Sequence, residues 1–237
     1  MRKRKLLILL TLLTLLLAGC KKSSSVDTNT IEVDKDGMIT STIIEDFDKD
    51  YYLEEELKQA IDNEIAEYNS AAGENAATVE KFNVKDKKVN VVIQFATAND
   101  YATLNNIPLF AGTIEEAIAA GYDFDSTFTK ITKGKVDGED TFKAADIVGL
   151  SDYKVIIVQE TTAVAVPGNI AYISEGITIR GKKSANFTIA GIETDIEESA
   201  ANDTASEESN STDAPVDTSA GTTDGEIVPG IGYIIYK

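Results

Sequence analysis

The sequence contains no histidine, no tryptophan and only one cysteine among its 237 residues. Without histidine, the chain cannot build a Ser/His/Asp triad, a Cys/His dyad or a His-ligated metal site. One cysteine cannot form a disulfide framework or a cysteine-rich zinc site. These absences exclude most of the familiar catalytic and metal-binding classes before any motif is considered.

Basic residues are scarce as well. Lys and Arg number 22 against 40 Asp and Glu, which gives a formal net charge of -18 at pH 7. Proteins that bind nucleic acids draw much of their affinity from clustered Lys and Arg, so no nucleic-acid partner is expected for this acidic chain. The length and a hydrophobic content of 43% suit one globular domain with tails.

The N-terminus has the composition of an export signal. Basic residues at positions 2–5 precede an apolar run over residues 6–17, and this order is typical of a signal peptide. As a helix, the run would be about 18 Å long, much shorter than the roughly 30 Å hydrocarbon layer of a bilayer. We therefore do not expect it to remain as a membrane span.

The apolar run ends in Leu17-Ala18-Gly19-Cys20. This sequence resembles the lipobox of bacterial lipoproteins, in which a diacylglyceryl group is attached to the cysteine and the chain is cleaved just before it. The resemblance implies that residues 1–19 are a signal peptide and that Cys20 is lipidated. Two or more acyl chains hold a protein stably on a bilayer. We therefore predict a lipid-anchored protein at the extracytoplasmic face of the cell membrane. The alternative is a buried cysteine behind an ordinary export signal.

The rest of the chain divides by composition. Residues 20–29 form a short polar tether, and residues 30–190 are predicted to be a single domain. Residues 191–227 are predicted to be an acidic disordered loop, because positions 193–226 hold eleven acidic residues with no base and no aromatic residue. Residues 228–237 are apolar again and are predicted to return to the domain as a final strand.

Hydrophobic periodicity predicts the elements of the domain. Residues 30–33 and 38–44 flank an Asp-Gly turn and are expected to form a hairpin. Residues 52–69 carry apolar side chains at helical spacing and predict a helix capped by Asp50. A polar turn is expected over residues 133–140. Further strands are predicted over residues 81–84, 89–97, 153–160, 162–166, 170–174, 176–179 and 185–189, and short helices over residues 97–105, 113–121 and 142–148. These elements predict an α+β fold, with a mostly antiparallel sheet, one long amphipathic helix and two or three short helices.

The best metal candidate is the alternation Asp46, Asp48, Asp50, which is similar to the start of a calcium loop. An EF-hand requires glycine at the sixth position and glutamate at the twelfth, where this chain has Tyr51 and Leu57. The favoured interpretation is a solvated helix start, and loose cation binding stays open. No metal or cofactor site is assigned.

Candidate catalytic groups are weaker still. Ser151 and Lys154 match the Ser-x-x-Lys spacing of penicillin-interacting enzymes, but the companion Lys-Thr-Gly is absent. A carboxylate pair for glycoside hydrolysis stays open, because such a pair is defined by distance in space. Tyrosines at positions 51, 52, 153, 172, 233 and 236 are expected at the edge of the core, with a sugar- or peptide-binding face as the alternative. No catalytic residue is assigned.

Residues 44–52, 152–158 and 233–237 together resemble a group of uncharacterised lipoproteins from Gram-positive clostridia. The resemblance implies an extracytoplasmic address and a shared fold, and it carries over no functional residue except Cys20. We predict a membrane-anchored lipoprotein that acts as a non-enzymatic binding or envelope-interaction module, with an envelope protein or polysaccharide as partner. The alternative is a cell-wall-active hydrolase that uses Asp/Glu acid-base chemistry.

Overall fold

The computed structural model describes residues 28–188 and 230–237. The predicted signal peptide over residues 1–19, the lipidation residue Cys20 and the predicted acidic loop over residues 191–227 lie outside these ranges. The structure therefore bears on the domain and on the last strand.

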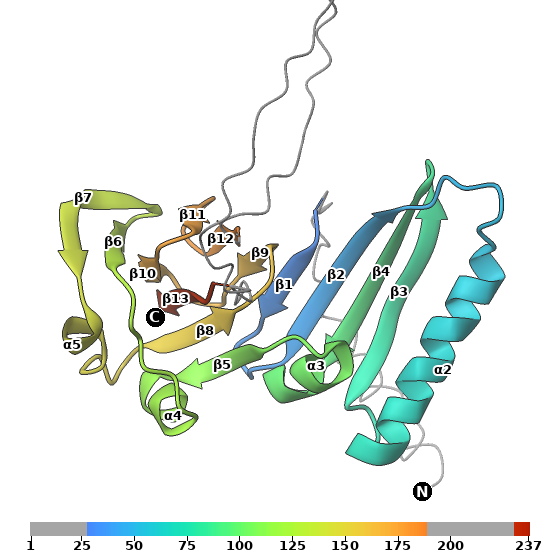
Figure 1. Cartoon of the computed structure of the whole chain (residues 1–237), viewed down its shortest axis with the longest axis horizontal. Helices are drawn as coiled ribbons and strands as arrows, with labels where there is room; N and C mark the ends of the chain where they lie inside the picture. The colour runs from blue at the N-terminus through green and yellow to red at the C-terminus, as the bar shows by residue number, and fades with distance from the viewer. Residues whose placement is uncertain (1–27, 189–229) are drawn as a thin grey trace, which may run out of the picture.

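The described strands form two sheets (Figure 1). Sheet A contains β1 (Thr30–Val33), β2 (Ile39–Asp46), β3 (Ala77–Lys85), β4 (Lys88–Phe95), β9 (Thr162–Ala165), β11 (Ile177–Ile179) and β12 (Ser184–Phe187). Sheet B contains β5 (Leu109–Thr113), β6 (Phe128–Thr132), β7 (Lys135–Phe142), β8 (Lys154–Val158), β10 (Ile170–Ser174) and β13 (Gly232–Tyr236). The helices are α2 (Glu54–Ala72), α3 (Ala98–Asn105), α4 (Ile114–Ala119) and α5 (Ala144–Ile147).

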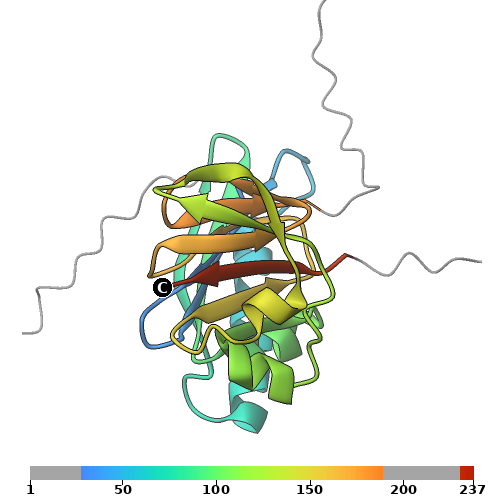
Figure 2. The same cartoon turned by 90° about the vertical axis from the view of Figure 1, so that its left-hand side faces the viewer.

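The strand order is β11-β12-β9-β1-β2-β4-β3 in sheet A and β5-β8-β13-β10-β6-β7 in sheet B. All pairings are antiparallel except that of β1 with β9. The strand expected at the end of the chain is β13, and it lies in the middle of sheet B between β8 and β10 (Figure 2).

The predicted α+β fold, with one mostly antiparallel sheet and one long amphipathic helix, is wrong. Strands take up 43% of the described residues and helices 22%, and the strands form two sheets. α2 has 19 residues, but only Ile65 in it is buried, and Leu53 of the expected apolar stripe is 54% exposed. The helix therefore does not provide the continuous core-facing stripe that the prediction required. Every residue of β13 is buried, and such a strand needs cover on both faces of its sheet.

Two apolar clusters give this cover. The larger cluster joins one face of sheet A to the inner face of sheet B, where Ile156 of β8 and Ile234 of β13 meet Ile31 and Val164 of sheet A. The smaller cluster lies on the outer face of sheet B, where α4, α5 and the segment around Phe124 pack. Sheet B is thus the middle layer of this part of the molecule.

The rest of the apolar face of sheet A is covered by α2 and α3. Val91 of β4 and Ile43 of β2 belong to the same cluster as Ile61 and Ile65 of α2. α2 lies along the β3 side of the sheet (Figure 1). The helices α2 and α3 therefore cover this end of sheet A as sheet B covers the other end, but α2 contributes only one buried residue, Ile65.

Several local predictions can be compared directly. The hairpin of β1 and β2 is confirmed. The Thr97 hydroxyl accepts a hydrogen bond from the Asp100 backbone N–H at 3.1 Å at the start of α3, and Thr113 and Glu116 form a reciprocal capping box on α4. The cap predicted at Asp50 is wrong, because the N-cap of α2 is Leu53 without a side-chain hydrogen bond.

The polar turn predicted over residues 133–140 is also wrong. Most of it is β7, which pairs with β6 through a two-residue turn at Lys133 and Gly134. β7 is an exposed edge strand with polar side chains, so its sequence lacks the apolar alternation that marks a half-buried strand.

Candidate functional site

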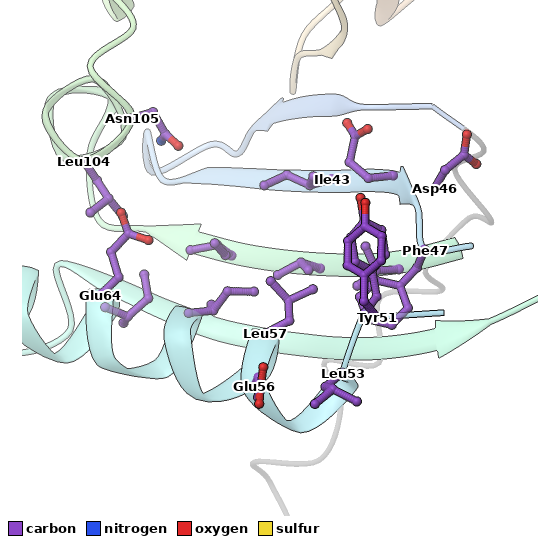
Figure 3. A pocket seen from close by; sticks show the side chains of 17 residues that line it. Ile43, Asp46, Phe47, Tyr51, Leu53, Glu56, Leu57, Glu64, Leu104 and Asn105 are labelled. Atoms are coloured by element: carbon purple, nitrogen blue, oxygen red, sulfur yellow. The ribbon is translucent and has the colours of Figure 1, made fainter. Parts of the chain in front are cut away.

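A groove of about 520 Å³ lies between α2 and the sheet A face formed by β2 and β4. Its walls are mainly aliphatic, with a contribution from α3. The aliphatic lining residues are Ile43, Leu53, Leu57, Ile61, Ile65, Val89, Val91, Ile93 and Leu104. Figure 3 shows Leu104 and Glu64 at one end of this α2 groove and Phe47 and Tyr51 at the other. The volume is within the range of small-molecule sites, roughly 300 to 1,000 Å³.

Three aromatic residues gather at one end of the α2 groove. The ring centroids of Phe47 and Tyr52 are 5.1 Å apart, and those of Tyr51 and Tyr52 are 4.9 Å apart in an edge-on arrangement. Tyr51 is 75% exposed, and the following Leu53 is 54% exposed. Large apolar side chains in consecutive exposed positions are unusual unless they contact a ligand or partner.

The segment that presents these rings is fixed by backbone hydrogen bonds at both ends. The Phe47 N–H donates to the Lys87 carbonyl at 2.7 Å, and the Tyr52 N–H donates to the Lys49 carbonyl at 3.0 Å. α2 then begins with three consecutive glutamates, whose charge favours the positive end of the helix dipole. β2 thus ends, the chain turns and α2 begins within a few residues. This arrangement places the aromatic side chains beside the groove.

Carboxylates complete the lining. Glu45, Asp46, Glu56 and Glu64 all line the α2 groove, and no basic residue does. The Lys88 ammonium donates to Asp46 Oδ1 at 2.7 Å. This hydrogen bond and the charge of Lys88 hold the pKa of Asp46 below its ordinary value. The groove therefore presents a negative edge around an apolar floor.

The aspartates of the calcium-like alternation do not come together. Asp46 bonds to Lys88, and Asp48 lies 3.3 Å from the ammonium of Lys49. Asp50 does not line the α2 groove. Over residues 28–188 and 230–237, no group of three or more His, Cys, Asp or Glu side chains is arranged to hold a metal ion.

The other predicted candidates are dispersed. Ser151 lies in the turn after α5, and Lys154 is the first residue of β8. Tyr233 and Tyr236, expected at the edge of the core, are both buried in sheet B. Tyr51 and Tyr52 are instead exposed, and both line the α2 groove.

The sequence did not predict the aliphatic residues that line the groove. Ile43, Val89 and Leu104 have the same periodicity as core residues, and nothing in the pattern separates a core wall from a groove wall. The available indication was the run Tyr51-Tyr52-Leu53, which places three large apolar residues between acidic neighbours just before a helix.

A half-buried carboxyl, that of Glu160, lies away from this groove. The Tyr101 hydroxyl donates to Glu160 Oε1 at 2.5 Å. Burial raises the pKa of Glu160 above its ordinary value, and burial together with the bond to Glu160 raises the pKa of Tyr101. Glu160 does not line the α2 groove. A glycosidase acid must face the bond that it protonates, so this pair ties α3 to the β8–β9 connection and is not placed for acid-base chemistry in the groove.

None of the helices in the described ranges has the length and hydropathy needed to cross a membrane. The chain matches no known protein-family model, and neither a curated protein nor a solved structure matches it significantly.

Proposed function

We propose that this protein is a lipid-anchored, extracytoplasmic binding module whose ligand site is the α2 groove. The lipobox at residues 17–20 supports the anchor at Cys20, and the exposed aromatic and aliphatic lining of the groove supports ligand binding. The groove is the single observation on which the assignment of a binding role depends.

The lining defines the chemistry of the ligand. Aliphatic walls gain free energy when they remove an apolar group from water, at about 25 cal/mol per Å². The carboxylates of Glu45, Glu56 and Glu64 favour a positive charge at the edge. The faces of Tyr51 and Tyr52 are additional sites for a cation. The ligand therefore joins an apolar group to a cationic group.

The electrostatics of the groove favour binding over catalysis. A general acid at neutral pH needs a carboxyl whose pKa is raised. The pKa of Asp46 is shifted in the opposite direction, because Lys88 stabilises its charged form. A carboxylate held in its charged form by a lysine does not donate a proton, so Asp46 is not placed to act as a general acid.

The test uses decyltrimethylammonium and decyl sulfate, which share a chain length and differ in the sign of charge. The chain has no tryptophan, so Tyr51→Trp introduces a single tryptophan at the groove, whose fluorescence can be excited selectively over that of the tyrosines. We expect the cationic probe to change its emission with a Kd about tenfold lower than that of the anionic probe, because several exposed carboxylates each add a modest attraction.

Leu53→Ser is expected to weaken binding of the cationic probe about fivefold, since it removes an apolar lining residue. Val136→Ser is the matched control, because Val136 is 58% exposed on β7, outside the groove, and Leu53 is 54% exposed. Equal affinity for the two probes, or equal effects of the two substitutions, would refute the groove as a site for an amphipathic cation.

A further inference from the structure

A second cavity, of about 380 Å³, lies in a different part of the molecule. It is formed by the β6–β7 turn, the start of β10, the β11–β12 connection and the last residue of the chain. None of its lining residues belongs to the α2 groove. Three of the lining residues are Lys133, Lys182 and Lys237, and among the described residues no Asp or Glu side chain lines this lysine pocket.

Such a group is unexpected in this chain, where acidic residues outnumber basic residues by 40 to 22. Over the described ranges, neither Lys133 nor Lys182 has an ion-pair partner. Charges farther away than about 8 Å are largely screened at physiological ionic strength. The local charge, and not the net charge of the protein, therefore decides which ions enter the pocket.

The third lysine is held at the edge of the pocket. Lys237 Nζ lies 3.0 Å from Asp152 Oδ2 and 5.2 Å from the centroid of the Tyr153 ring. Asp137 is the other carboxylate bonded to a lining residue: it accepts from the Thr132 hydroxyl at 2.7 Å and lies 4.0 Å from Lys130. Both carboxylates are therefore already engaged with donors.

Backbone contacts fix the positions of the lysines. Lys133 and Gly134 form the two-residue β6–β7 turn with φ angles of 54° and 80°. A Cβ atom at Gly134 would lie 2.9 Å from the backbone nitrogen of Lys182, so the two turns are in direct contact and only glycine fits between them. The Asn169 N–H donates to the Lys237 carbonyl at 2.7 Å, and the Lys237 N–H donates to the Asn169 carbonyl at 3.0 Å.

We infer that the lysine pocket binds an anionic ligand that carries a phosphate group. Lysine ammonium groups are point charges suited to phosphate oxygens. Asn169 also lines the pocket, and its side-chain amide is a neutral hydrogen-bonding group for the rest of the ligand. This site is independent of the α2 groove and has the opposite preference for charge.

Isothermal titration calorimetry of the full chain with glycerol phosphate tests the inference, with glycerol as the uncharged probe. We expect glycerol phosphate to bind and glycerol not to bind. A parallel arm measures sedimentation with phosphatidylglycerol and phosphatidylcholine vesicles. Binding of soluble glycerol phosphate identifies a soluble phosphate ester as the source of the group, and binding to the phosphatidylglycerol vesicles alone identifies a lipid headgroup.

The variant Lys133→Asn combined with Lys182→Gln should weaken this binding at least about tenfold, because two charge-assisted contacts are removed. Asparagine tolerates the left-handed backbone of the turn, so the fold should be retained. Lys87→Asn is the matched control, since Lys87 also lies in a two-residue turn with a φ angle of 60°.

If the double variant does not fold, Lys182→Gln alone takes its place, because the side chain of Lys182 is exposed. This single variant should also weaken binding of the phosphate probe. Absence of binding by both glycerol phosphate and phosphatidylglycerol vesicles at millimolar phosphate would overturn the inference. An equal loss of affinity in Lys87→Asn would also overturn it, since nonspecific attraction would then explain the binding.

Discussion

At the scale of single residues, the hydrogen bond between Tyr101 and Glu160 joins a buried tyrosine to a half-buried carboxyl. Tyr101 is 4% exposed and packs edge-on against Phe95, with ring centroids 5.2 Å apart. Its hydroxyl is the donor to Glu160. A buried carboxylate without such a donor would lose the compensation for leaving water.

Tyr101→Phe is expected to lower the free energy of unfolding by about 1 to 3 kcal/mol at neutral pH. Burial raises the pKa of Glu160 above its ordinary value of 4.5. The raised pKa therefore makes its full contribution to the free energy of unfolding below pH 4.5. This contribution is lost as the pH rises through the raised pKa of Glu160. The hydrogen bond from Tyr101 opposes this rise in the pKa of Glu160. Removal of the hydrogen bond should therefore lower the free energy of unfolding more at pH 8 than at pH 5, as measured by urea titration.

Glu160→Gln is the control for this prediction. Its amide oxygen still accepts from Tyr101, but it does not titrate. In this background the cost of Tyr101→Phe should be the same at pH 5 and pH 8. A cost in the native background that does not depend on pH would show that Glu160 is charged over the whole range.

At the scale of elements, α2 and β13 differ sharply in burial. α2 has 19 residues and buries only Ile65, whereas β13 has five residues and buries all of them. Regions with few buried apolar contacts open locally at lower free energy than the core. α2 is also a wall of the groove, so the least buried long element is the one beside the proposed ligand.

Ile65→Ala should therefore loosen α2 selectively. The substitution removes the one buried side chain of the helix, with an expected cost of about 2 kcal/mol, at the lower end for such truncations. Native-state hydrogen exchange should show faster exchange of α2 amides and little change in β13.

Ile234→Ala, in the centre of sheet B, is the contrasting variant and should destabilise α2 and β13 together. If the amides of α2 and β13 exchange with the same free energy of opening in the unmodified protein, then α2 does not open separately and the prediction is wrong.

At the scale of the whole molecule, two parts of the chain that are far apart in sequence meet at β12 and β13. A Cβ atom at Gly232 would lie 2.6 Å from the Phe187 ring. Phe187 is the last residue of β12, and Gly232 is the first residue of β13. The two ends of the segment over residues 189–229 are therefore close enough to be joined by a short loop.

Deletion of residues 193–226, with a short Gly/Ser turn in their place, should leave the fold intact. The cost of loop closure grows with the logarithm of length, so the shorter loop should raise the free energy of unfolding by no more than about 1.5 kcal/mol. Thermal unfolding followed by circular dichroism measures the result. A fall of more than about 10 °C in Tm would mean that the acidic segment contributes contacts to the domain, because a change of 1 kcal/mol shifts Tm by only a few degrees.

Some structural features followed from the sequence because their causes are local. The β1–β2 hairpin depends on an Asp-Gly turn, and the caps at Thr97 and Thr113 depend on residues three positions away. The local pattern was misleading at Asp50, because α2 begins after Leu53, and in β7, because an exposed strand paired to its neighbour β6 needs no apolar alternation.

The sequence by itself limited the available chemistry: a chain without histidine and with one cysteine has few catalytic options, and its acidic composition predicts no nucleic-acid partner. Tertiary structure alone decided that the strands divide into two sheets and that β13 joins the middle of one of them. It also decided which aliphatic residues line a groove and which lysines share a pocket. The physical reason is that these features depend on pairings between residues far apart in the chain, and periodicity carries no information about such pairings.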